Sequence, residues 1–343
     1  MQPSLAANAR GRLLPALGIL LLLGACGDKL RTIELTGATM GTTYSVKLIA
    51  ADEPDGLSAQ IGMTLAAIDG SMSTYLPDSE LSKFNADTRT SWIEVSKQLC
   101  AVIDQAQQIS ERSGGAFDVT VGPLVNLWGF GSAGIADQPP EQQAIIAALE
   151  MVGFRRLQTD CAMPALRKEI PGLYVDLSGY AKGYAVDQVA ALLDDAGIAD
   201  YLVEIGGEMR MRGANLKRDH WAIAIETPTR GERSVQTIVR LTDSAIATSG
   251  DYRNYFEYDG TAYSHTINPS TGYPVAHDAA SVTVVADTTA FADGIATALL
   301  VLGPEAGLEL AEREQIAAYF LLRNGDGIEE RMSSLFASAV LTP

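Results

Sequence analysis

Near the C-terminal end of the chain, a carboxylate and a hydroxyl stand one helical turn apart. Asp293 and Thr297 are four positions apart within 292–298, where the other residues are small or apolar. On a helix, residues four apart share one face, and an unpaired carboxylate among apolar neighbours is costly. Hard cations such as Mg²⁺ bind oxygens, typically one or two carboxylates, with waters and substrate phosphates completing the shell. The pair is either a Mg²⁺ site or a polar helix start with Thr297 packed inside.

A second candidate lies in residues 176–187, where a short apolar strand over 173–177 is expected to end and a helix over 181–196 to begin. The first turn of that helix would present free N–H groups and the Lys182 ammonium, a setting that suits a phosphate. Two ordinary roles explain the same residues. Asp176 could be a helix N-cap, and Lys182 a solvated surface lysine.

Residues 113–118, with the sequence SGGAFD, form a third candidate. The glycines permit close approach of the backbone to a ligand, and Phe117 with Asp118 places a ring beside a carboxylate. Alone this is a weak signal, because a helix C-cap followed by a strand is the more common explanation of such a segment.

The fourth candidate is a histidine. Of the three in the chain (His220, His265 and His277), only His265 lies between polar residues just before the turn-forming sequence of 268–272. Its near-neutral unperturbed pKa suits a general base. Strand alternation would direct Ile267 to the same face. The alternative is that His265 only fixes the turn through a hydrogen bond.

Composition limits the partners of this site. The 343 residues are 47% hydrophobic, which is enough for a substantial core, and 32 glycines and 14 prolines imply many turns. The net charge of −17 would repel nucleic acid, so we exclude nucleic acid partners. An anionic small ligand remains compatible if a metal ion supplies the missing positive charge.

The N-terminus has the features of a bacterial lipoprotein signal. Arg10 and Arg12 precede an apolar run over 13–24, which is too short to span a bilayer as a mature helix. It leads to LGAC, ending at Cys26, which resembles a lipobox and predicts a signal peptide over 1–25, lipidation of Cys26 and a periplasmic location at a membrane. An ordinary signal peptide with a chance cysteine is the alternative.

After lipidation of Cys26, Cys100 and Cys161 would remain. In an oxidising periplasm they could form a disulfide, or both could be small buried hydrophobic residues, and the sequence leaves the two interpretations open. They are too few and too isolated for a metal site. One domain is expected over 26–343.

Periodicity predicts an α+β fold with antiparallel strands backed by helices. Apolar residues at helical spacing indicate a helix over 57–72, and Ser96 is a candidate N-cap for a helix reaching 112. Further helices are expected over 139–151, 181–196 and 288–302, a hairpin over 33–49, and strands over 201–205, 221–225, 237–241, 252–258, 281–285 and 317–322.

Taken together, these segments resemble the ApbE-like family, the FAD:protein FMN transferases. The family implies an α+β fold of two interlocked halves of antiparallel sheet with packed helices, related to the T-fold, and a ligand groove between the halves. The matching segments run in order along the chain over 40–42, 113–118, 128–131, 176–187, 204–208, 248–253, 264–274 and 293–297.

The resemblance also implies roles for individual residues. Mg²⁺ would be held by a backbone carbonyl in the turn at Gly179 and by the side chains of Asp293 and Thr297. Some members have a second carboxylate three residues after that Asp, where this chain has Ala296, so the number of Mg²⁺ ions stays open. The family also implies residues that contact FAD. Met40 and Tyr75 would line the flavin or adenine, and Ala116, Phe117 and Asp118 would hold the nucleotide. Asp176 and Lys182 would contact FAD, and Ile267 would face it beside His265.

The implied reaction takes FMN from FAD and attaches it to a Ser or Thr hydroxyl of an acceptor protein, with AMP as leaving group. Periplasm-facing redox subunits with a short Ser/Thr-Gly-Ala-Ser/Thr type motif are the implied acceptors. One alternative is an FAD pyrophosphatase, in which water replaces the hydroxyl, although the bulky ring of Tyr75 would restrict water. The other is a flavin-binding lipoprotein without turnover, which needs neither a metal nor a base.

Overall fold

The computed structural model describes residues 29–340 except 133, 135, 230–233 and 326. The predicted signal peptide and Cys26 lie outside the described residues. The centre of the fold is an eight-stranded sheet in the order β1-β2-β6-β7-β10-β13-β14-β15, in which every neighbouring pair is antiparallel. Its strands are β1 (Arg31–Thr39), β2 (Thr42–Ala50), β6 (Tyr201–Ile205), β7 (Glu208–Arg212), β10 (Ser244–Gly250), β13 (Ala279–Ala286), β14 (Ala317–Asn324) and β15 (Gly327–Met332).

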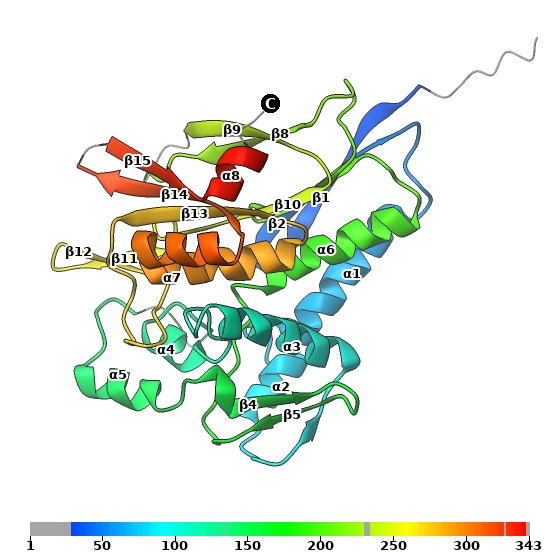
Figure 1. Ribbon diagram of the computed structural model, residues 1–343. Coiled ribbons are helices and arrows are strands. Elements are labelled where there is room, and N and C mark those ends of the chain that lie inside the picture. Colours follow the sequence, from blue (N-terminus) through cyan, green and yellow to red (C-terminus); the bar gives the residue numbers. More distant parts are fainter. Residues whose placement is uncertain (1–28, 133, 135, 230–233, 326, 341–343) are drawn as a thin grey trace, which may run out of the picture.

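Helices cover one face of this sheet (Figure 1), and the main hydrophobic core lies between these helices and the sheet. α7 (Thr289–Arg313) packs on β10 and β13, and α6 (Ala181–Asp195) packs on both α7 and the sheet. α1 (Leu57–Met72) lies against α6 because its apolar residues recur every three or four positions and form one buried stripe. α3 (Lys97–Arg112) starts where predicted, since the Ser96 side chain accepts a hydrogen bond from Leu99 N.

The opposite face carries a smaller core. The hairpin of β8 (Trp221–Glu226) and β9 (Val235–Leu241) covers it together with α8 (Ser334–Ala339). The remaining elements surround the helical side. They are α2 (Glu80–Ala86), β3 (Ile93–Glu94), α4 (Gly122–Leu127), α5 (Gln142–Leu149), the 3-10 turn η1 (Phe154–Arg156), β4 (Leu157–Asp160), β5 (Ala165–Lys168), β11 (Tyr255–Tyr258) and β12 (Thr261–Ser264).

The predicted α+β class with antiparallel sheets is confirmed, although one predicted strand is absent and another is shorter than expected. Residues 173–177 form no strand, because the Asn85 side chain takes the place of a neighbouring strand and bonds both Val175 N and Val175 O at 2.8 Å. The strand predicted from residue 252 begins only at Tyr255. The helix predicted to end at 302 does end at a non-helical residue, Gly303, and a second helical segment then follows as far as Arg313.

α7 continues past a kink at which Gly303 has φ 78° and Pro304 follows. Pro304 has no N–H, so the carbonyl of Leu300 lacks its helical partner. His277 replaces that partner, with Nε2 2.7 Å from Leu300 O. Of the helices in the described part of the chain, α7 alone is long and apolar enough to span a membrane, but 67% of its most apolar window is buried inside the fold. It is the core helix.

A disulfide joins Cys100 to Cys161, with the Cα atoms 5.7 Å apart. The sequence left open whether these cysteines pair or are two buried hydrophobic residues, and in the structure they pair. It ties the start of α3 to the turn between β4 and β5.

Candidate active site

A cavity of about 440 Å³ opens between the sheet, the helices α6 and α7, and the loops that precede them. Residues from nearly every predicted segment line it, although these segments are far apart in the sequence. Met40 is not among the lining residues; it lies in the turn between β1 and β2 and packs against the main core. The predicted residues that line the cavity are Tyr75, Ala116, Phe117, Asp118, Asp176, Gly179, Lys182, His265, Ile267, Asp293 and Thr297.

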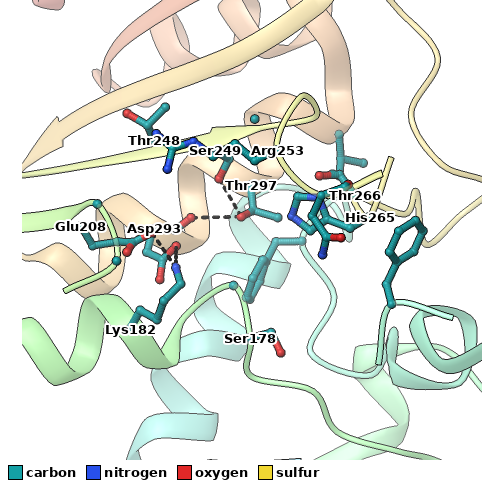
Figure 2. Close-up of a pocket in the computed structure, with 18 of the residues that line it drawn as sticks. Ser178, Lys182, Glu208, Thr248, Ser249, Arg253, His265, Thr266, Asp293 and Thr297 are labelled. Atoms are coloured by element: carbon teal, nitrogen blue, oxygen red, sulfur yellow. Dashed lines mark hydrogen bonds and ion pairs between the residues drawn. The ribbon is translucent and has the colours of Figure 1, made fainter. Parts of the chain in front are cut away.

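Asp293 and Thr297 share the face of α7 that meets the cavity (Figure 2). Asp293 is 4% exposed, and its Oδ2 accepts a hydrogen bond from Gly183 N at 3.1 Å. The Thr297 hydroxyl donates to Asp293 O at 3.2 Å and lies 3.0 Å from Ser249 Oγ. A Cβ atom on Gly179 would lie 3.3 Å from Thr297 Oγ1, so the turn at Gly179 closely approaches this hydroxyl.

The close approach of α6 to α7 depends on a glycine. A Cβ atom on Gly183 would lie 2.4 Å from the backbone oxygen of Thr289, so a larger residue would push the helices apart. α7 is also capped from α6, because the Asp187 carboxylate accepts hydrogen bonds from Thr289 N at 3.0 Å and Ala290 N at 2.9 Å. These contacts bring Asp293 to the first turn of α6.

The donor set at this point fits Mg²⁺. Among the described residues, no backbone N–H donates to Asp293 Oδ1, which lies 4.0 Å from Lys182 Nζ, and the Thr297 hydroxyl on the same helix face lies close to the turn at Gly179. Burial raises the pKa of Asp293, with Lys182 acting in the opposite direction, so a cation would relieve a costly buried carboxylate. No group of three or more His, Cys, Asp or Glu gathers anywhere in the described residues. Such an ion would depend on substrate oxygens to complete its shell.

Lys182 is held by a buried glutamate that sequence reasoning did not single out. Its Nζ lies 2.5 Å from Glu208 Oε1, and Figure 2 shows it directed toward Glu208 and Asp293. Burial lowers the pKa of Lys182, but the two carboxylates raise it more, so the ammonium is retained. Glu208 is 4% exposed, its Oε2 has no partner among the described residues, and desolvation raises its pKa to about 7.

The start of α6 differs from the expected phosphate cradle. Ala181 N donates to Leu177 O at 2.8 Å and Gly183 N donates to Asp293, so these first-turn N–H groups are used within the protein. Asp176 is not the N-cap of α6, because its Oδ1 accepts from Ser178 N at 2.8 Å in the turn before the helix. Lys182 is the part of this segment that carries positive charge to the cavity.

Asp118 lines the cavity, but its carboxylate is occupied. Oδ1 accepts from Thr120 N at 2.7 Å and from the Thr120 hydroxyl at 2.6 Å, and Oδ2 accepts from Phe154 N at 3.0 Å. Burial nevertheless raises the pKa of Asp118 above its ordinary value. The side chain therefore shapes the 113–121 segment, which presents Ala116 and Phe117 to the cavity.

His265 follows directly after β12 and lies across the cavity from Lys182, with Thr297 between them (Figure 2). Its Nδ1 is 3.1 Å from Asn254 O, and Phe130 packs edge-on with ring centroids 6.3 Å apart. A carbonyl oxygen only accepts, so in the neutral ring Nδ1 carries the proton and Nε2 keeps a lone pair. Burial lowers the pKa of His265 and so favours the neutral ring, and the hydrogen bond to Asn254 opposes this shift.

Tyr75 and Ile267 complete the predicted set. Tyr75 is 61% exposed, and its hydroxyl donates to Phe130 O at 3.1 Å, which ties the loop between α1 and α2 to the segment that follows α4. Ile267 is buried and forms an isolated antiparallel bridge with Pro274. Aromatic and apolar side chains thus line the same cavity as Asp293 and Lys182.

Comparison with known proteins identifies the group of proteins that share this arrangement. The profile of the ApbE family matches residues 40–320. The chain belongs to the ApbE family. It is 45% identical to the FAD:protein FMN transferase of Vibrio cholerae over 326 residues, covering 94% of this chain and 97% of that protein. It is 41% identical to the protein of the same name from Escherichia coli K12 over 312 residues, covering 90% and 89% of the two chains.

Solved structures of ApbE proteins have the same fold. The flavin transferase ApbE from Vibrio cholerae superposes with a TM-score of 0.83 at 44% identity, covering 90% of this chain and 99% of that one. The apo form of the flavinyl transferase ApbE from Pseudomonas stutzeri gives 0.82 at 41% identity, covering 90% and 96%. The chain is accordingly an enzyme of the transferase class, with the α+β fold expected of the ApbE family.

Three cavity residues of this ApbE-family chain were given no role from the sequence. Glu208 follows Gly206-Gly207 at the start of β7, where a charged residue ordinarily faces solvent, and only tertiary packing buries it. Ser249 lies at the end of β10 beside Thr297, and Arg253 pairs with Glu226. The available signals were the family match over 204–208 and the glycine pair before Glu208, which permits a tight turn against the start of α6.

Proposed function

We propose that this chain transfers FMN from FAD to a Ser or Thr hydroxyl of another protein in a Mg²⁺-dependent reaction that releases AMP. The names of its relatives support flavin transfer from FAD to protein. The observation that supports the metal dependence is the Asp293 oxygen that accepts from no backbone N–H of the described residues, on the helix face where the Thr297 hydroxyl meets the turn at Gly179.

In the proposed reaction the acceptor oxygen forms a bond to the phosphorus on the FMN side of the pyrophosphate. The bond from that phosphorus to the bridging oxygen breaks, and AMP leaves with the bridging oxygen. Asp293, Thr297 and a carbonyl of the Gly179 turn would hold Mg²⁺, which supplies positive charge for the pyrophosphate oxygens. Lys182 adds a fixed ammonium 4.0 Å from Asp293.

His265 is the proposed general base. A Ser or Thr hydroxyl is a weak nucleophile at neutral pH, and a positioned base increases the rate roughly 10²–10⁴-fold. The bond from Nδ1 to Asn254 O leaves the Nε2 lone pair to take the hydroxyl proton. The bound flavin or adenine would lie among Ala116, Phe117, Tyr75 and Ile267, with Asp118 supporting that wall and Asp176 beside the Gly179 turn.

One experiment separates this function from its alternatives. The protein is incubated with FAD, Mg²⁺ and an acceptor protein carrying a Ser/Thr motif, and AMP and the mass of the acceptor are followed. FMN transfer predicts one AMP for each FMN added to the acceptor. AMP with free FMN and an unmodified acceptor would make the enzyme a pyrophosphatase, and bound FAD without AMP would make it a flavin-binding protein.

We further propose that the mature chain is anchored by lipid on Cys26 at the periplasmic face of a bacterial membrane, where its acceptor is a periplasm-facing redox subunit. The Cys100–Cys161 disulfide supports an oxidising compartment. Cys26→Ser should leave the precursor unprocessed or move the protein out of the detergent phase. Unchanged membrane partitioning of that variant would exclude the anchor.

A further inference from the structure

One backbone carbonyl fixes both the chain and the ring of His265. Asn254 O accepts a hydrogen bond from His265 N at 3.0 Å and lies 3.1 Å from His265 Nδ1. Asn254 belongs to the four-residue loop over 251–254 that joins β10 to β11. The position of this loop therefore determines where the imidazole lies and which of its nitrogens carries the proton.

An ion pair at the start of this loop holds it to the main sheet. Arg323 of β14 binds the Asp251 carboxylate with both terminal nitrogens, Nη1 lying 2.8 Å from Oδ2 and Nη2 contacting Oδ1. The Asp251 side chain is only 12% exposed. A two-pronged contact between guanidinium and carboxylate fixes orientation as well as distance. The backbone adds one bond, from Asp251 N to Ala280 O at 3.1 Å.

The pair holds the loop from outside the cavity. Tyr252, Arg253 and Asn254 line the cavity, whereas Asp251 and Arg323 are not among its lining residues. β14 is itself held by its ladders to β13 and β15, so the strand does not depend on the pair for its place in the sheet. The contact instead joins a strand of the main sheet to the loop whose Asn254 carbonyl contacts the histidine.

We propose that the Asp251–Arg323 ion pair positions His265, by holding the loop so that Asn254 O keeps the proton on Nδ1 and leaves Nε2 free to act as the base. Asp251 and Arg323 are thus positioning residues, which act through Asn254 and not on the substrate. The inference rests on the proposed function, since it presumes that His265 is the base for FMN transfer.

The test reads the protonation of the ring directly. The chain has three histidines, so ¹⁵N-histidine labelling gives few ring signals, and His265→Ala assigns those of His265. The variants are Arg323→Ala, Arg323→Lys and Asp251→Asn. The matched control is Arg212→Ala, which removes an ion pair with Asp194 from residues that do not line the cavity.

We expect wild type and Arg212→Ala to show His265 protonated on Nδ1 when neutral. Arg323→Ala and Asp251→Asn should lose this preference and transfer FMN at least about tenfold more slowly, the scale of losing a partner that orients a functional group. Their affinity for FAD should stay within about twofold of wild type, since neither residue lines the cavity. Arg323→Lys, which keeps the charge but not the two-pronged contact, should fall between them and wild type.

A wild-type tautomer and rate in Arg323→Ala would overturn the proposal, and so would a parallel loss of FAD affinity, which would mean that the pair only supports the pocket. Absence of FMN transfer by the wild type would instead refute the proposed function. The ring signals need no turnover, so the two failures are distinguishable.

Discussion

The two sides of the cavity treat their buried carboxylates differently. On the side of the 113–121 segment, both oxygens of Asp118 accept hydrogen bonds from Thr120 and Phe154. On the side of α6 and α7, Asp293 has one oxygen that no backbone group uses, and Glu208 has a buried oxygen without a partner in the described part of the chain. A buried carboxylate with unused capacity destabilises the fold unless something binds it. We infer from this difference that Asp118 supports the pocket, and we propose Asp293 as the ligand-binding carboxylate.

Asp293→Ala is expected to have the largest effect, and it tests whether Asp293 is the carboxylate that binds a ligand. We expect FMN transfer to fall at least about 10³-fold, the scale of losing a preorganised electrostatic group, because the carboxylate on the same face of α7 as Thr297 is removed. The fold should remain, as judged by circular dichroism and FAD binding, since a destabilising buried charge is lost with it. AMP release and acceptor mass measure the effect.

Chelation is the matched control for Asp293. EDTA should reduce the wild type to the level of the variant, and added Mg²⁺ should restore the wild type but not Asp293→Ala. Full activity of the wild type in excess chelator would remove the metal from the reaction and end the distinction between the two carboxylates.

His265→Ala should have the next largest effect. The variant should bind FAD and Mg²⁺ as the wild type does, yet transfer FMN at least about a hundredfold more slowly, because the acceptor hydroxyl loses its base. His277→Ala is an informative comparison, since His277 replaces the missing helical bond at Leu300 O and should affect stability more than transfer. If His265→Ala transferred at a near wild-type rate, another group would be the base, with Asp176 or Asp118 to be tested next.

The sequence predicted those features that depend on neighbouring residues. The apolar period of 57–72 and the Ser96 cap placed α1 and the start of α3, since both signals lie within a few residues. It failed where distant residues decide. The 173–177 segment has the composition of a strand, but its partner is the side chain of Asn85, about 90 residues away.

The same distinction applies to the site. The sequence singled out Asp293, Lys182 and His265 because of their residue types and local patterns, and they line one cavity. It could not tell that Asp118 is occupied, because Phe154 N comes from 36 residues further on. Nor could it find Glu208, which becomes a buried carboxylate only when β7 packs against the start of α6.

The pH dependence of transfer sharpens the role of His265. Burial lowers the pKa of this ring below its ordinary value of 6.5, so more acid is needed to protonate the base. At saturating FAD and acceptor, the rate should be flat near neutral pH and fall about tenfold per pH unit only below a midpoint under 6.5. Burial raises the pKa of Glu208 to about 7, so its titration must be distinguished from that of His265.

Glu208→Gln provides that separation. Its Oε1 can still accept from Lys182, but the side chain no longer titrates. The fall in transfer rate at acid pH should persist in Glu208→Gln. It should be absent from the residual activity of His265→Ala. If the fall in rate at acid pH disappeared only in Glu208→Gln, the titrating group would be Glu208 and not His265.

Asp118→Asn is the smallest change, and it tests the other side of the comparison. The amide can still accept from Thr120 N and the Thr120 hydroxyl, but its NH₂ group would face Phe154 N, and two donors cannot pair. Leaving a buried N–H unsatisfied costs about 1–3 kcal/mol, so the midpoint of urea unfolding should fall while transfer by the folded enzyme changes only a few-fold. Asp293→Asn should do the reverse, with little loss of stability and a large loss of transfer. If Asp118→Asn instead abolished transfer at unchanged stability, Asp118 would bind the substrate directly, and the distinction between a supporting and a ligand-binding carboxylate would not hold.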